Sequence, residues 1–264
     1  MTMILAGAKP GLARLASVAK AIAVACACIC GAPDGVAQAQ ASPWRDEPIA
    51  RLEATALLAS FEAALLSGES ATATLERWCE VHGLANPARI SAERVPGDKP
   101  APSDVLRELR LTSPFEVRYR RVRLKCGAHV LSEADNWYAP ARLTPEMNRV
   151  LDTSDEPFGR VVKPLSYARR TRSATLLWRP LPEHWEVAGG TATAGGPATA
   201  GRAAATASAR SRATAPRALP IPARLLSVRA ELVLPDGTPF SVVDETYSGE
   251  ILAFPQPHLP HVID

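Results

Sequence analysis

A segment that reads as a β-strand, residues 117–126 with the sequence VRYRRVRLKC, carries five cations in ten residues. Side chains of a strand alternate between its two faces, so Val117 and Tyr119 share one face with Arg121. The apolar residues then move to the even positions, and we expect a β-bulge at residues 121–122 to reconcile the two halves. Arg121 is thereby predicted to point inward. The other cations are predicted to cover a solvated face: Arg118, Arg120, Arg123 and Lys125.

An inward arginine needs an anionic partner, because an unpaired buried charge is costly. Its planar guanidinium matches a carboxylate, which either the protein or a ligand can supply. Glu245 is a second ionisable residue on an apolar strand face, since it shares its phase with Val243 and Tyr247. Together, Arg121 and Glu245 predict either a structural ion pair or a pocket for a small anion.

Helices lead and strands follow in the segments that must position these residues. Periodicity and capping residues predict helices at 45–68, 69–83, 104–111 and 144–152. Strands are expected at 88–95, 117–126, 130–140 and 173–178, with a hairpin over 224–248 that turns at Pro-Asp-Gly-Thr. The first helix has apolar residues at three- and four-residue spacing, including Ile49, Leu52 and Leu66. Without βαβ alternation, the order predicts an α+β fold with a single antiparallel sheet and helices packed on it.

The first 41 residues have the pattern of an export leader. Basic residues precede a short apolar run at 21–30, and small residues at 37–42 offer cleavage after Ala39 or Ala41. The mature protein is therefore expected outside the cytoplasm, in the periplasm. A misassigned start, with a cytoplasmic protein, is the alternative. The apolar run is shorter than the ~20 residues that a spanning helix needs, so no stable membrane span is expected.

A low-complexity segment divides the rest of the chain. Residues 188–220 consist mainly of Ala, Gly, Thr, Ser and Arg, which predicts a disordered insertion within a single domain formed by 42–187 and 221–254. Residues 255–264 form a Pro-rich tail. The formal charge of +3 divides into +2 for residues 1–41 and +4 for residues 188–220, which leaves −3 elsewhere. A mildly acidic domain argues against binding nucleic acid through bulk charge.

Cleavage of the leader would leave two cysteines, Cys79 and Cys126. One disulfide is permitted in an oxidising compartment. We expect instead two buried thiols that act as small hydrophobes. Neither cysteine has metal-ligand spacing, and His258 and His261 lie in the Pro-rich tail, so no metal site is expected.

Five short blocks resemble the chorismate lyase (chorismate pyruvate-lyase) family, and they occur in the order that this family shows. They cover residues 65–78, 120–140, 156–162, 171–178 and 234–248. The likeness spans roughly residues 46–180 and 222–250. It implies one antiparallel sheet with helices on a face, enclosing a small buried ligand site. The same UTRA-like fold serves as the effector-binding domain of many bacterial transcription regulators, so the fold alone does not imply catalysis.

The resemblance also implies roles for particular residues. It places the carboxylate-binding arginine on Arg121 and the essential glutamate on Glu245, and both would be catalytic. It places the ligand-binding backbone amides on Ala71 and Phe158. The implied reaction converts chorismate into 4-hydroxybenzoate and pyruvate, as in ubiquinone biosynthesis, and needs no cofactor. Glu245 would hydrogen-bond the ring hydroxyl and help to remove the adjacent proton.

Two positions depart from the family pattern. Asn136 stands where the family has an arginine in the flap over the ligand, and Asp135 replaces the preceding glycine. Asn136 is therefore a substrate-binding position with altered chemistry. These departures and the leader favour an alternative, an exported non-catalytic binder of a small aromatic or hydroxy acid. In both readings the partner is a small aromatic carboxylate, and the protein is expected to be a monomer.

Overall fold

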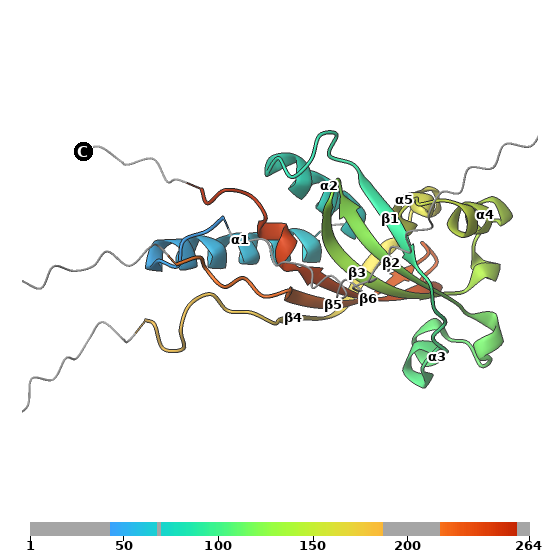
Figure 1. Ribbon diagram of the computed structural model, residues 1–264. Helices are drawn as coiled ribbons and strands as arrows, with labels where there is room; N and C mark the ends of the chain where they lie inside the picture. Colours follow the sequence, from blue (N-terminus) through green and yellow to red (C-terminus); the bar gives the residue numbers. More distant parts are fainter. Residues whose placement is uncertain (1–42, 68–69, 187–216, 258–264) are drawn as a thin grey trace, which may run out of the picture. The chain divides into compact units, whose positions relative to one another are not determined.

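Six strands form one sheet in the order β1-β2-β3-β6-β5-β4, and each neighbouring pair is antiparallel. The computed structural model describes residues 43–67, 70–186 and 217–257 (Figure 1). The strands are β1 (Ile90–Val95), β2 (Arg118–Cys126), β3 (His129–Tyr138), β4 (Ala168–Leu176), β5 (Arg224–Val233) and β6 (Pro239–Ser248). The predicted α+β class with a single antiparallel sheet is confirmed.

Helices cover both faces of this sheet. They are α1 (Pro48–Ser67), α2 (Ala71–Val81), α3 (Ser103–Leu109), α4 (Pro145–Thr153) and α5 (Phe158–Val161). Short 3-10 turns are η1 (Pro114–Glu116), η2 (Pro140–Arg142), η3 (Lys163–Leu165) and η4 (Gly249–Leu252). Helices α1 and α2 pack on one face, in the largest core cluster. Helix α3 packs on the opposite face, against Trp137 and Val242.

Local signals place the helix starts correctly, but the buried stripe of α1 differs from its predicted apolar spacing. Ser70 caps α2 by accepting a hydrogen bond from the amide of Ala73, and Thr144 caps α4 in the same way. On α1, Ile49, Leu52 and Leu66 are 56%, 39% and 48% exposed. The buried residues are Ala50, Ala54, Leu58, Phe61 and Leu65. Because much of this helix is apolar, the stripe that includes the large Phe61 ring buries more area than the predicted one.

Strand β2 changes its apolar phase without a bulge at residues 121–122, so that prediction was wrong. Its pairing with β3 is regular from Arg118 to Leu124, and the register shifts only between Leu124 and Lys125. Val117 and Tyr119 pack on the α3 face, whereas Val122 and Leu124 pack on the face covered by α1 and α2. Two covered faces allow the apolar phase to switch along a regular strand. The even-numbered residues of β2 therefore face α1 and α2.

The segment around the predicted insertion is described only at its edges. Residues 1–42, 187–216 and 258–264, which hold the predicted leader, most of the insertion and most of the tail, lie outside the described residues. Leu219 is 1% exposed, and Ala218 forms a β-bridge with Arg45, so the packed chain resumes before residue 221. In the described part of the chain, no helix has the length and apolar character that a bilayer crossing requires.

Candidate anion-binding site

A small cavity of about 50 Å³ lies between the sheet and the first residues of α2 and α5. Four of the five predicted site residues line it: Ala71, Asn136, Phe158 and Glu245. The fifth, Arg121, does not, and its neighbour Arg120 lines the cavity instead. Residues that are far apart in the sequence thus meet at one place on the α1/α2 face of the sheet.

Arg120, and not Arg121, is the inward arginine. Arg120 is 7% exposed, whereas the side chain of Arg121 is 43% exposed and forms ion pairs with Glu133 (3.3 Å) and Asp135 (3.7 Å) on the other face. Arg121 does share a face with Val117 and Tyr119, but α3 covers that face, which is opposite to the one that lines the cavity. The expectation that Arg121 points inward and Arg120 outward was therefore wrong.

The guanidinium of Arg120 has no acidic counter-ion among the described residues. One terminal nitrogen donates to the backbone oxygen of Glu156 (3.2 Å), and the buried Nε has no hydrogen-bond partner. Burial lowers the pKa of Arg120, because the charged form loses hydration. A buried guanidinium with an unused N–H group beside a cavity has the chemistry to bind an anion.

Glu245 is also buried, and it is held by the protein. An oxygen of its carboxylate lies 2.6 Å from a terminal nitrogen of Arg169 on β4, and it accepts a hydrogen bond from the Tyr247 hydroxyl (2.9 Å). The prediction that Val243, Glu245 and Tyr247 share an inward face is confirmed, since all are buried. Burial lowers the pKa of Arg169, but attraction to Glu245 outweighs burial and raises the pKa overall. Burial and the Glu245 carboxylate raise the pKa of Tyr247 well above its usual value.

Arg169 is a cavity residue that the sequence did not predict. It lines the same cavity, and its buried Nε, like that of Arg120, has no hydrogen-bond partner. The cavity thus holds two guanidinium groups and one carboxylate, a balance of one positive charge. That balance suits a monoanion, and two buried Nε–H groups have no hydrogen-bond partner within the described chain.

The flap positions lie on opposite faces of the sheet. Asn136 is 4% exposed, and its side-chain oxygen accepts a hydrogen bond from the Ser241 hydroxyl (2.6 Å) within the cavity wall. Asp135 lies on the α3 side, where the Tyr119 hydroxyl (2.6 Å) and the Lys99 ammonium (3.0 Å) bind it. Burial and the Asp135 carboxylate raise the pKa of Tyr119 to about 12. Only Asn136 can therefore contact a ligand in the cavity.

The backbone amides that the resemblance implicates belong to the first residues of two helices. Ala71 is the first residue of α2, and Phe158 is the first residue of α5. Amides at the start of a helix have no acceptor within it, so they are free to bind a ligand. Gly159 brings the two helices close together, since a Cβ at this position would lie 2.8 Å from the Ser70 hydroxyl. The described residues contain no group of three or more His, Cys, Asp or Glu side chains that could hold a metal ion.

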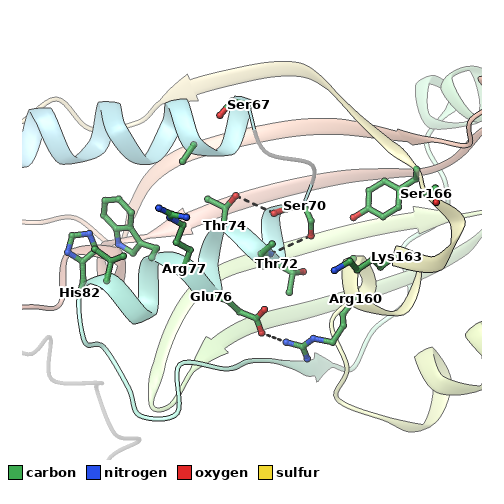
Figure 2. Close-up of a pocket in the computed structure, with 16 residues that line it drawn as sticks. Ser67, Ser70, Thr72, Thr74, Glu76, Arg77, His82, Arg160, Lys163 and Ser166 are labelled. Carbon is green, nitrogen blue, oxygen red and sulfur yellow. Dashed lines mark hydrogen bonds and ion pairs between the residues drawn. The ribbon is translucent and has the colours of Figure 1, made fainter.

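A larger pocket of about 1000 Å³ lies next to the cavity, between α2 and the α5–η3 segment (Figure 2). Ser70, Thr72, Gly159 and Tyr167 line both spaces, so they form the wall between them. Figure 2 shows Arg77 extending from α2 toward the end of α1, and Lys163 extending from η3 toward α2.

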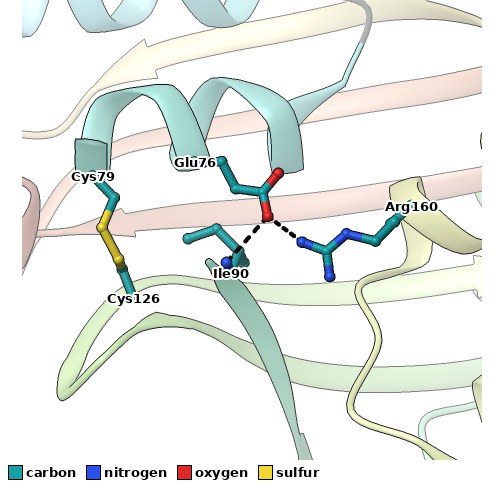
Figure 3. The surroundings of a disulfide bond; sticks show 5 residues. All are labelled: Glu76, Cys79, Ile90, Cys126 and Arg160. Atoms are coloured by element: carbon teal, nitrogen blue, oxygen red, sulfur yellow. Dashed lines mark hydrogen bonds and ion pairs between the residues drawn. A yellow bond between two sulfur atoms is a disulfide. The ribbon is translucent and has the colours of Figure 1, made fainter. Parts of the chain in front are cut away.

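Helix α2 is fixed to its surroundings by a disulfide and an ion pair (Figure 3). Cys79 at its end is bonded to Cys126 on β2, with a Cα–Cα distance of 6.5 Å. The expectation of two separate thiols was therefore wrong, because the packing of α2 on β2 brings the sulfurs together. Glu76 accepts a hydrogen bond from the amide of Ile90 (3.2 Å) and pairs with Arg160. These bonds connect α2 to β2, β1 and α5.

Comparison with known proteins identifies a relative. No family model matches the chain. A protein of Sinorhizobium fredii (strain NBRC 101917 / NGR234), described as "Uncharacterized protein y4mC", is 44% identical over 218 residues, which cover 82% of this chain and 84% of the relative. The chain belongs to the y4mC family.

Solved structures show weaker likeness to this y4mC family member. PhnF from Mycobacterium smegmatis has a TM-score of 0.41 at 12% identity and covers 75% of this chain and 71% of its own. The effector domain of PhnF has a TM-score of 0.39 at 12% identity, and the match covers 69% of this chain and 90% of that domain. A GntR-family transcriptional regulator from Enterococcus faecalis V583 has a TM-score of 0.32 at 13% identity, and the match covers 64% of this chain and 97% of the regulator.

Proposed function

We propose that this protein binds a small carboxylic acid in the cavity, with Arg120 as the principal anion-binding residue. The observation that supports this function is the buried guanidinium of Arg120, which has no counter-ion in the described chain and an unused Nε. The unused Nε of Arg169 supplies a second donor on the same cavity. A carboxylate would satisfy both donors and neutralise the excess positive charge.

The size of the cavity restricts the part of the ligand that it encloses. A volume of about 50 Å³ is small beside the ~150 Å³ of an engineered cavity that binds benzene. The cavity has room for a carboxylate with few carbon atoms. An aromatic acid would require α2 and α5 to separate where Gly159 meets Ser70.

The test compares Arg120→Met with Arg121→Met, two neighbouring arginines on opposite faces. Calorimetric titration would use acetate, benzoate and 4-hydroxybenzoate as probes. We expect Arg120→Met to weaken binding of every bound probe by about 100-fold or more, because a desolvated charge contact is worth ~3–5 kcal/mol. Arg121→Met should change affinity less than about fivefold, since an exposed ion pair contributes ~1 kcal/mol or less.

Stability measurements guard this test against misfolding. Methionine removes a buried unpaired charge and retains an apolar stem, so Arg120→Met should unfold at an equal or higher denaturant concentration than the wild type. A stable variant that has lost binding would support the proposal. Equal weakening by the two substitutions, or unchanged binding in Arg120→Met, would contradict it.

Chorismate pyruvate-lyase activity is the second candidate function. It is favoured by the presence of Arg120, Glu245, Ala71 and Phe158 around one cavity, which are the residue types that the resemblance implies, with Arg120 in place of Arg121. Arg120 would hold the ring carboxylate, and Glu245 would contact the ring hydroxyl. The ion pair with Arg169 opposes this role, because it occupies an oxygen of the Glu245 carboxylate.

Turnover separates the two candidates. The purified protein would be incubated with chorismate, and formation of 4-hydroxybenzoate would be followed by chromatography. Product that disappears in Glu245→Gln, while 4-hydroxybenzoate still binds that variant, would establish the lyase. If the wild type binds 4-hydroxybenzoate but does not convert chorismate, the result would support a non-catalytic binding protein.

We also propose that the mature protein is exported to the periplasm. The order of basic, apolar and small residues in 1–41 supports export. The Cys79–Cys126 disulfide adds support, because such bonds persist in oxidising compartments and are rare in the cytosol. Cell fractionation with N-terminal sequencing tests this proposal, and an intact Met1 on a cytosolic protein would overturn it.

A further inference from the structure

We infer that the larger pocket beside the cavity binds a second anionic group of the same ligand, through Arg77 and Lys163. This inference rests on the proposed function, because it assumes that one carboxylate of the ligand occupies the cavity at Arg120. It assigns the ligand to a narrower chemical class, an elongated molecule with an acidic group at each end.

The pocket contains two cations that the described chain leaves without an acidic partner. Neither Arg77 nor Lys163 forms an ion pair or side-chain hydrogen bond with the described residues. The other charged residues on the wall neutralise each other, since Arg160 pairs with Glu76 and also with Glu156 outside the pocket. The pocket therefore has an excess of positive charge and the space to bind a hydrated acidic group.

A ligand that contacts these cations and also Arg120 must extend from the cavity into the larger pocket. Arg77 comes from α2 and Lys163 from η3, and both side chains extend into the pocket (Figure 2). The pocket and the cavity share the wall that contains Gly159, whose lack of a side chain allows α5 to lie close to Ser70 and Thr72. A chain that passes this wall can place one acid at Arg120 and the other near Lys163 and Arg77.

The remaining lining of the pocket suits an apolar spacer between the two acids. Ala64, Ala73, Trp78 and Val81 contribute aliphatic and aromatic surface. Burying methylene groups there is favourable at about 0.8 kcal/mol each. A dicarboxylic acid with a hydrocarbon spacer therefore matches the pocket better than a compact polyanion does.

Three probes test the inference by calorimetry on the full chain. Octanedioate has both acids, octanoate has the same chain with one acid, and acetate reaches only the cavity. We expect octanedioate to bind the wild type about tenfold more tightly than octanoate, which corresponds to ~1.4 kcal/mol. The double variant Arg77→Gln/Lys163→Gln should abolish this difference and leave the affinity for acetate unchanged.

The matched control is Arg224→Gln, which removes an exposed cation at the start of β5, outside the pocket. It should preserve the tenfold preference for octanedioate. Equal affinities of octanedioate and octanoate in the wild type would overturn the inference. Acetate binding that is lost in Arg120→Met would still support the proposed function. A preference that survives in the double variant would also overturn the inference. If the wild type shows no preference for octanedioate over octanoate, but Arg120→Met loses binding of all three probes, then only the inference about the pocket fails.

Discussion

The buried pair of Arg169 and Glu245 offers the sharpest energetic prediction. Their side chains are 4% and 5% exposed, and the charged atoms lie 2.6 Å apart. Removing one partner leaves the other charge buried without compensation, which typically costs ~3–5 kcal/mol. Replacing both with apolar residues of similar volume is often neutral or stabilising. We therefore expect strongly non-additive effects in a double-mutant cycle.

The cycle would use Arg169→Met, Glu245→Leu and the double variant, with unfolding by urea followed by circular dichroism. Each single substitution should lower the free energy of unfolding by about 3 kcal/mol or more. The double variant should lie within about 1.5 kcal/mol of the wild type, because a shape-conserving apolar exchange is tolerated at roughly that level. Tyr247 loses its acceptor in Glu245→Leu, which accounts for about 1 kcal/mol of the residual cost.

A second cycle provides the control. Arg149 and Glu146 on α4 also form an ion pair, but their side chains are 62% and 67% exposed. Their coupling energy should lie between about 0.2 and 1 kcal/mol, because water screens exposed pairs. Additive effects at Arg169 and Glu245, or a coupling no larger than that of the exposed pair, would refute the prediction that burial couples these two charges strongly.

Two further predictions concern stability. The Cys79–Cys126 disulfide joins residues 47 apart in the sequence, so its removal in a Cys79→Ser/Cys126→Ser variant should lower the free energy of unfolding by up to about 4 kcal/mol on the chain-entropy model; a reductant should destabilise the wild type but leave that variant unchanged. The second prediction concerns Asp135. Burial raises the pKa of Asp135, but hydrogen bonds from Tyr119 and Lys99 outweigh burial and lower this pKa below the ordinary value of 3.8. The ionised carboxylate therefore stabilises the fold above pH 3.8, and this stabilisation disappears as the pH falls through the folded-state pKa. The unfolding free energies of the wild type and Asp135→Asn should thus differ at pH 7 and converge in acid; a difference that stays constant with pH would show that Asp135 acts without its charge.

Local features of the sequence were enough to predict most elements of the fold. Capping at Ser70 and Thr144 located two helix starts, and the Pro-Asp-Gly-Thr turn located the hairpin between β5 and β6. Such signals depend on neighbours within a few residues. The resemblance then brought Glu245 and Asn136 to one cavity, and the geometry agrees with that grouping.

The inward arginine was misplaced because a single strand does not reveal which of its faces is covered. Alternation along β2 identifies an inward side chain only if one face is buried, whereas Tyr119 packs toward α3 and Val122 packs toward α1 and α2. The pairing Arg120↔Asn136 resolves the ambiguity, since paired residues in neighbouring strands share a face. This pairing already places Arg120 beside a position that the resemblance assigned to the site.

Arg169 was missed for a different reason. It lies at the start of β4, where the sequence ARRTRSATL has no apolar alternation, so the predicted strand began only at residue 173. Its contact with Glu245 crosses from β4 to β6 past β5 and joins residues 76 apart. No local pattern encodes such a contact. The disulfide is equally non-local, because it depends on how α2 packs on β2.

Arg120 differs from the other buried charges of the described chain in its lack of a counter-ion. In the described chain, the buried carboxylates Glu245 and Glu231 have Arg169 and Arg172 as counter-ions, whereas Arg120 has none. Bulk attraction cannot substitute for a specific partner, since the sequence outside residues 1–41 and 188–220 carries a formal charge of −3. An unpaired buried cation destabilises the empty protein by several kcal/mol, and a bound anion would return that free energy as affinity. The destabilisation from burying Arg120 and the proposed binding of a carboxylate would thus be two consequences of the same side chain.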